Sequence, residues 1–138
     1  DADTGKARFW AKDSALTSKA AGAMFYITNT QAEAVLENTN LKFSSGVLAE
    51  VTSDRWGKTG ANGGDFSLTG IRQELAGDIL ANSISTVTVN LTQNTKLEGA
   101  VNKENTAKKA ALLLDASSSW NVTADSYVTV FKDADLQH

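Results

Sequence analysis

The chain has 138 residues, which suits a single domain able to bury roughly two-thirds of the surface that it would expose unfolded. Its 13 basic and 16 acidic residues give a net charge of −3 and are mixed along the sequence, which disfavours nucleic acid as a partner. The absence of cysteine excludes disulfides and thiolate zinc sites, and no apolar run approaches the roughly 20 residues of a membrane-spanning helix. We therefore expect no membrane insertion, no metal and no cofactor.

Proline is absent from the whole sequence, although it usually makes up about 5% of residues. Because proline removes a backbone donor, it is excluded from central strands. Its absence favours a chain that consists almost entirely of paired strands.

Short groups of apolar residues follow one another along the chain, and we assign them in rotation to three faces. The first face takes Phe9 with Ala11, Val35, Phe66 with Leu68, Val89 with Leu91, and Leu112 with Leu114. The second face takes Leu16, Leu41 with Phe43, Leu75 with Ile79, Leu97 with Val101, and Trp120 with Val122. The third face takes Phe25 with Ile27, Val47 with Val51, Ile84, and Val128 with Val130.

The apolar groups recur at a fixed interval in the C-terminal half. Phe66, Val89 and Leu112 follow one another at an interval of 23, and Leu68, Leu91 and Leu114 repeat it. A period of this length is typical of a solenoid, in which each repeat buries its apolar face against the next one. Apolar residues alternate within each repeat, which indicates strands. The sequence thus predicts an all-β, single-stranded right-handed parallel β-helix with three faces and about five rungs, stacked about 4.8 Å apart.

Corner residues between the predicted strands are those that tight turns favour, because asparagine tolerates left-handed backbone angles and serine or threonine bonds the local backbone. The expected corners are Asn29-Thr30, 38–40, 44–46, 93–95 and 116–118. Two longer stretches interrupt the strands. Residues 54–65 are glycine-rich and are predicted to form a loop excursion, and residues 102–109 are predicted to form a wide turn or one helical turn.

The glycine-rich loop is the best candidate for a ligand site. Arg55 and Lys58 supply cations, Trp56 supplies a stacking surface, and Asn62 and Asp65 supply polar groups, a combination suited to a glycan. The alternative interpretation is purely structural: Trp56 packs onto a face, and Arg55 pairs with a neighbouring carboxylate.

An enzymatic alternative is a fragment of a polysaccharide lyase or glycoside hydrolase. Such chemistry requires two carboxylates roughly 5 to 9.5 Å apart. The candidate carboxylates on the predicted faces are Glu50, Glu74, Asp78, Glu98 and Asp115. Glu74 and Glu98 are separated by an interval of 24 and could lie on neighbouring rungs, yet charged residues on a strand usually face solvent. No catalytic residue is therefore assigned.

Several segments resemble the C-terminal part of large bacterial secreted right-handed parallel β-helix repeat proteins, a group described as adhesin-like surface proteins. These segments are Phe25-Tyr26-Ile27-Thr28-Asn29-Thr30, Arg55-Trp56-Gly57 followed by Asn62-Gly63-Gly64-Asp65, Leu75-Ala76-Gly77-Asp78-Ile79, Asn82-Ser83-Ile84-Ser85 and Ser119-Trp120-Asn121-Val122-Thr123-Ala124-Asp125-Ser126-Tyr127.

The resemblance implies that residues 1–138 form one β-helix domain, the C-terminal rungs of a longer solenoid. It further implies a secreted or cell-surface location and a non-enzymatic structural or adhesion role. From the glycine-rich loop around Trp56 we expect weak contact with an extracellular glycan, and the alternative partner is a cell-surface or extracellular protein. Since an open solenoid end carries unpaired strand edges, we also expect self-association through the N-terminal end.

Overall fold

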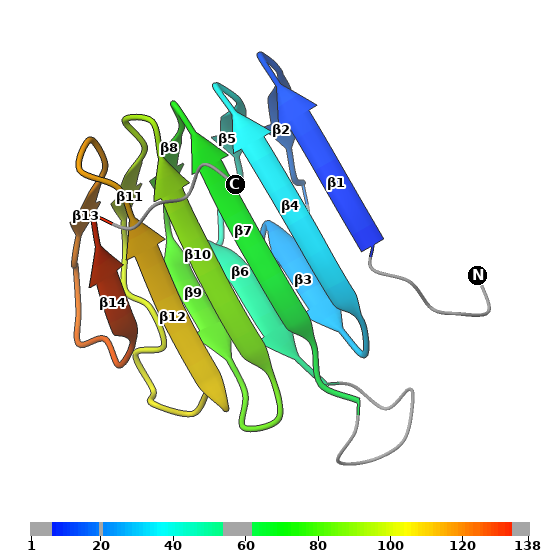
Figure 1. The fold of residues 1–138 in the computed structure, drawn as a ribbon. Helices are drawn as coiled ribbons and strands as arrows, with labels where there is room; N and C mark the ends of the chain where they lie inside the picture. The colour runs from blue at the N-terminus through cyan, green and yellow to red at the C-terminus, as the bar shows by residue number, and fades with distance from the viewer. Residues whose placement is uncertain (1–6, 20, 54–61, 134–138) are drawn as a thin grey trace.

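The computed structural model describes residues 7–19, 21–53 and 62–133. These residues form 14 strands and no helix, and every strand pair among them is parallel (Figure 1). The predicted all-β character with parallel sheets is confirmed. In the described part of the chain, no helix is long and apolar enough to cross a membrane.

The strands belong to four sheets. The first and largest sheet has the order β1 (Ala7–Lys12), β4 (Gln31–Glu37), β7 (Asp65–Ile71), β10 (Thr86–Thr92), β12 (Lys109–Leu114) and β14 (Thr129–Lys132). A second sheet pairs β2 (Ala15–Thr17) with β5 (Asn40–Lys42). The third contains β8 (Glu74–Ala76), β11 (Lys96–Glu98) and β13 (Ser119–Asn121). The fourth contains β3 (Phe25–Thr28), β6 (Val47–Thr52) and β9 (Asp78–Ala81).

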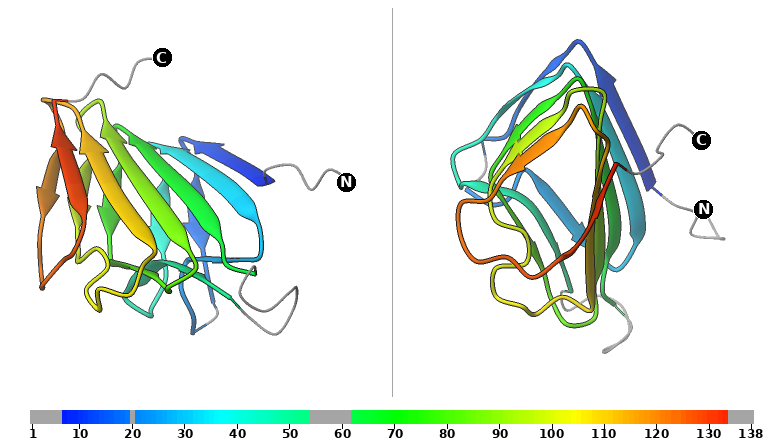
Figure 2. Two further views of the ribbon diagram at one scale, coloured as in Figure 1. Left: turned by 60° about the horizontal axis from the view of Figure 1, so that its bottom comes forward. Right: turned by 60° about the vertical axis from the view of Figure 1, so that its left-hand side comes forward.

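The chain returns to the first sheet after passing through one or two strands of the other sheets (Figure 2). Residue alternation explains why these segments are strands. In β10, Val87, Val89 and Leu91 are buried, whereas Thr86, Thr88 and Asn90 between them are partly exposed. Period-2 patterning of this kind is compatible with one inward and one outward strand face, and not with a helix.

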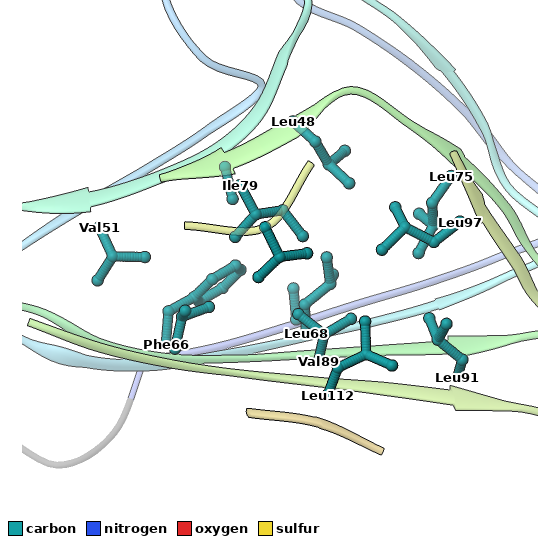
Figure 3. Close-up of a cluster of buried hydrophobic side chains, with 14 of the residues drawn as sticks. Leu48, Val51, Phe66, Leu68, Leu75, Ile79, Val89, Leu91, Leu97 and Leu112 are labelled. Carbon is teal, nitrogen blue, oxygen red and sulfur yellow. The ribbon is translucent and has the colours of Figure 1, made fainter. Parts of the chain in front are cut away.

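A single apolar cluster fills the interior between the sheets (Figure 3). The first sheet contributes Phe66, Leu68, Val89, Leu91 and Leu112, which face Leu48, Val51 and Ile79 of the fourth sheet and Leu75 and Leu97 of the third (Figure 3). Leu68, Val89 and Ile79 have no exposed surface. Burying a side chain of this size stabilises the fold by about 1.5–3 kcal/mol.

The predicted register, in which paired residues are separated by an interval of 23, is correct for the pairing of β10 with β12 and wrong for the pairing of β7 with β10. Leu91 pairs with Leu114 as expected, but Leu68 pairs with Val89, an interval of 21. The interval between β8 and β11 is 22, as in the pairing of Leu75 with Leu97. The intervals lengthen because the corner before β11 has three residues, 93–95, where the corner before β8 has two, 72–73. Since a two-residue difference is one full pleat, the same side chains still face inward.

Several face assignments are also wrong. Val122 lies outside the strands and is 49% exposed, so it is not an inward residue of the second face. Val35 pairs with Thr69, whose row faces outward, although Val35 is itself mostly covered. Ile79 belongs to the fourth sheet and forms a parallel bridge with Val101, so neither lies on the second face as predicted. Val130 pairs with Leu112 and therefore belongs to the first sheet. Val35 lies in the predicted sheet but in its outward row, so apolar character alone did not identify its face. The errors at Ile79, Val101 and Val130 arise because apolar spacing does not determine which sheet receives a residue; the corner lengths do.

Left-handed residues mark one corner of the molecule, where the strands of the first sheet end. Asp13, Asn38, Arg72 and Gln93 directly follow β1, β4, β7 and β10 and have φ angles of 51°, 47°, 46° and 51°. We call these four residues together with Asp115 the corner column. Side chains link neighbours in the column: Asn38 Nδ2 donates to Asp13 Oδ1 at 2.8 Å, and Arg72 Nη1 donates to Gln93 Oε1 at 2.9 Å. The predicted corner at 93–95 is therefore confirmed, and the corner predicted at 38–40 is confirmed for residues 38 and 39, whereas Asn40 already belongs to β5.

The wide turn predicted at 102–109 is also present, without a helix. Asn102 organises it, because its Oδ1 accepts hydrogen bonds from the Thr106 and Ala107 amides, both at 3.1 Å. Its Nδ2 donates to the Tyr127 carbonyl at 2.9 Å, which ties this turn to the segment that precedes β14.

Candidate functional site

A broad groove of about 880 Å³ lies beside the corner column. Its volume falls within the range of about 300–1,000 Å³ that is usual for ligand sites. Its walls come from the corner column, from the β5 and β8 region, and from β11 and β13: Asp13, Ser14, Asn38, Thr39, Asn40, Leu41, Arg72, Glu74, Leu75, Ala76, Lys96, Leu97, Glu98, Ser119 and Asn121.

The groove crosses a place where the backbone ladder is interrupted. β5 pairs only with β2, and β8 pairs only with β11, so the second and third sheets are separate. The side chain of Gln73 spans the interruption. Its Oε1 accepts a hydrogen bond from the Thr39 amide at 2.7 Å, and its Nε2 donates to the Thr39 carbonyl at 2.5 Å. Gln73 is only 2% exposed, so its side-chain amide replaces a peptide unit of the missing ladder.

The third sheet lines the floor of the groove with two rows of side chains. Parallel pairing aligns Glu74, Lys96 and Ser119 in one row, and Glu98 and Asn121 in the next. All five residues are exposed. Because paired strands lie about 4.8 Å apart, the rows present polar groups at a regular spacing.

Arg72, which lines the groove, belongs to a network of charges behind it. Arg72 makes an ion pair with Glu37, and Lys12 Nζ lies 3.9 Å from Oε2 of the same carboxylate. Glu37 is 8% exposed, so the two cations compensate for the cost of burying its charge. Arg72 is therefore engaged in the protein and is not a free cation for a ligand.

The charged residues of the groove nearly balance. Asp13, Glu74 and Glu98 are acidic, and Arg72 and Lys96 are basic, which leaves a net charge of −1. The remaining polar groups are amides and hydroxyls, which both donate and accept hydrogen bonds. The groove therefore suits a neutral ligand rich in hydroxyl groups and does not favour a polyanion.

The glycine-rich loop falls largely outside the described residues, since Arg55, Trp56 and Lys58 lie in 54–61. Asn62 is 6% exposed, and its carbonyl accepts a hydrogen bond from the Asn29 amide. Asp65 is exposed at the start of β7, and its carboxylate accepts from Thr86 Oγ1 at 2.7 Å. Ligand binding by this loop remains a prediction.

Glu74 and Glu98, which were weighed above as a carboxylate pair and not assigned, do not lie opposite each other. Glu74 lies opposite Lys96, and Glu98 lies opposite Ala76, so the two carboxylates are offset by two residues along the strands. The offset arises because β8 and β11 pair at an interval of 22, shorter than the interval of 24 that would bring the carboxylates together. Among the residues that the structure describes, no group of three or more His, Cys, Asp or Glu side chains is placed to hold a metal ion.

Two carboxylates titrate below their ordinary range, and both serve structural links. Burial raises the pKa of Asp78, but a hydrogen bond from the Ala100 amide and the bond and charge of Lys103 lower the pKa by more. Burial likewise raises the pKa of Asp115, and hydrogen bonds from the Gln93 amide, Ser117 and Ser118 outweigh that effect, so the pKa is lowered. Neither environment raises the pKa, as a general acid would require.

Sequence reasoning missed the groove. Leu41, Leu75 and Leu97 were assigned to the second face, and the polar residues of the groove were not connected to a site, because strand ends that are distant in the sequence come together only through the register. The signal that could have found the groove is the run Ile71-Arg72-Gln73-Glu74. Two long polar residues, Arg72 and Gln73, occupy this corner, whereas the other predicted corners contain Asn, Ser or Gly.

Comparisons with known proteins give no relative on which to base a function. No protein-family model matches the chain, and neither a curated protein nor a solved structure does. The geometry of the groove and the pairing of the strands are thus the basis for the function proposed below.

Proposed function

We propose that the chain is a right-handed parallel β-helix of about five rungs that serves as a non-enzymatic structural or adhesion module of a secreted or cell-surface protein. In this proposal it makes weak contacts with a neutral extracellular glycan through the groove over β8, β11 and β13. Its three faces are the first sheet, the second and third sheets together, and the fourth sheet.

The observation that carries the proposal is the parallel pairing of six strands in the first sheet, one from each successive pass of the chain, around one apolar core. An arrangement of this kind gives a stiff rod whose stability is the sum of nearest-neighbour contacts. The likeness of several segments to bacterial β-helix surface proteins supports the secreted or cell-surface location.

The neutral-glycan part rests on the chemistry of the groove. Regularly spaced carboxylate, amide and hydroxyl groups match the many hydroxyls of a sugar chain, since each hydroxyl donates one hydrogen bond and accepts others. Aromatic side chains are absent from the residues that line the groove. Without a stacking platform for sugar rings, binding is expected to be weak.

A glycan array carrying neutral and uronic-acid oligosaccharides tests the proposal, followed by calorimetric titration of the strongest neutral hit. Glu98→Gln and Lys96→Ala each remove an exposed polar contact in the groove and are expected to weaken binding roughly two- to tenfold. Glu104→Gln and Lys109→Ala make the same changes at exposed positions outside the groove and should leave binding unchanged.

Three outcomes would contradict parts of the proposal. Exclusive binding of acidic oligosaccharides would exclude the neutral-glycan assignment. Normal binding by the groove variants, together with loss of binding in Trp56→Ala, would move the contact to the glycine-rich loop. Polysaccharide turnover that disappears in Glu74→Gln or Glu98→Gln would replace the non-enzymatic role with the lyase or hydrolase alternative.

A further inference from the structure

All large apolar side chains that are well exposed in the described residues lie in the first or last strands and their connections. They are Phe9, Trp10, Tyr26, Val122, Tyr127 and Phe131. Residues 31–114, apart from the gap at 54–61, contribute none to this set. Exposed apolar surface that gathers at two places marks interaction sites more often than surface scattered singly.

The N-terminal end presents unpaired strand edges. Among the described residues, β1 pairs only with β4, β2 only with β5, and β3 only with β6, so each of these three strands has one edge without a partner strand there (Figure 1). Phe9 pairs with Ala34, a core residue, yet Phe9 is 43% exposed. A free edge of this kind is a template for another strand.

The opposite end carries the matching edge. β14 pairs only with β12, and β13 only with β11, at the far side of the molecule from β1 (Figure 2). Val130 of β14 pairs with the core residue Leu112, and Phe131 beside it is 50% exposed on the outward side. This edge therefore offers an inward apolar residue next to an outward aromatic one, as β1 does with Phe9 and Trp10.

The register aligns the exposed aromatics of the two ends. Parallel pairing links one outward row across the first sheet, in the order Trp10, Val35, Thr69, Asn90, Leu113 and Phe131. If β1 of one copy were added beside β14 of another in the same direction, this row would place Trp10 next to Phe131. Aromatic pairs directly opposite on adjacent strands stabilise the pairing by about 0.2–1 kcal/mol.

The net charges of the two ends are opposite. Residues 7–28 carry a net charge of +2, from Arg8, Lys12, Lys19 and Asp13. Two of these cations, Arg8 and Lys12, also form ion pairs with carboxylates of β4. Residues 115–133 carry a net charge of −2, from Asp115, Asp125, Lys132 and Asp133. Contact between two N-terminal ends would bring like charges together, whereas contact between an N-terminal and a C-terminal end is complementary.

We propose that the partner of the N-terminal edge is the C-terminal edge of a second copy of this chain, with β1 of one copy added to β14 of the next as a parallel strand. The contact uses different surfaces on the two copies and does not close on itself, so it produces linear head-to-tail oligomers. Each added copy extends the first sheet, covers Phe9 and Val130, and pairs Trp10 with Phe131.

Two variants that each block one end test the proposal with the full chain. Trp10→Asp and Phe131→Asp place a charge at exposed positions, 71% and 50% exposed, and so leave the core intact. Sedimentation of the unmodified chain should show masses that increase with concentration beyond a dimer. At concentrations where the unmodified chain associates, each variant alone should remain monomeric. The dissociation constant for its self-association should be at least about tenfold higher than that of the unmodified chain. Thr88→Asp, in the middle of the same sheet, should associate normally.

Mixing the two blocked variants gives the decisive result. Phe131→Asp keeps an intact N-terminal edge and Trp10→Asp keeps an intact C-terminal edge, so the mixture should form one-to-one dimers and nothing larger. Dimers of Phe131→Asp alone would show that two N-terminal ends associate, and this would overturn the proposal. So would a chain that stays monomeric at all concentrations, or a mixture in which the two variants do not associate. Circular dichroism of each variant checks that it is folded.

Discussion

Replacing Gln73 by leucine tests the claim that one side-chain amide holds the second and third sheets together. Leucine is close to glutamine in size, so it fills the site but removes the two bonds to the Thr39 peptide at 2.7 and 2.5 Å. Thr39 is 4% exposed, and its amide and carbonyl would be left without these partners. Each buried polar group that loses its partner costs about 1–3 kcal/mol, so Gln73→Leu should lower the free energy of unfolding by about 2–6 kcal/mol.

The measurement is equilibrium unfolding in urea, followed by circular dichroism, with the free energy and its urea dependence fitted together. Gln31→Leu is the matched control, because Gln31 is an exposed strand residue whose amide makes one 3.4 Å contact with Asp65. The control should change the free energy by no more than about 0.5 kcal/mol. We call the two hydrogen bonds between the Gln73 side chain and Thr39 the Gln73 bridge. If Gln73→Leu lowered the free energy of unfolding no more than the control does, the Gln73 bridge would not link the two sheets.

Three further predictions follow from register, burial and charge. The double variant Ser67→Cys with Thr88→Cys should form a disulfide, because these two positions are directly paired. The double variant Ser67→Cys with Asn90→Cys should not, because the Cα atoms of these two positions are about 7–8 Å apart. Mass spectrometry distinguishes the oxidised from the reduced chain. Leu68→Ala should cost about 2–5 kcal/mol in the same urea assay, because Leu68 is fully buried. Since folding lowers the pKa of Asp115 below 3.8, its ionised form stabilises the fold above that pH, and the contribution is lost as pH falls; Asp115→Asn should flatten this acid-side decline.

The sequence was sufficient to predict strands, parallel sheets and most inward positions, because all three depend on local alternation and on a nearly constant repeat interval. Leu91 and Leu114 are paired as expected. The pairing of Leu68 with Val89 could not be predicted, because the corner 72–73 and the connection 77–85 are each slightly shorter than their counterparts 93–95 and 99–108. Together they shift the register by two residues, which preserves the inward face, so the alternation carries no record of the shift.

The candidate groove was less accessible to prediction, because its defining residue looks ordinary in the sequence. Gln73 lies in the polar run 71–74 and matches no motif, and its buried environment arises only when Thr39, far earlier in the chain, comes to lie beside it. Arg72 was likewise inconspicuous, although it adopts a φ angle of 46° and pairs with Glu37. Charged residues at strand ends usually face solvent, so sequence reasoning assigned no such role to either residue.

The bridge and the groove have a common cause. A continuous backbone ladder between β5 and β8 would align these strands as closely as the paired strands of the third sheet, about 4.8 Å apart. Instead, the Gln73 side chain reaches Thr39, and the backbones of β5 and β8 do not pair. Asn40 and Glu74 therefore remain exposed in the groove. Stability and binding should therefore respond differently to substitution. Removing the bridge should disturb both properties, whereas changing Glu98 or Lys96 on the groove floor should alter binding and leave the free energy of unfolding nearly unchanged.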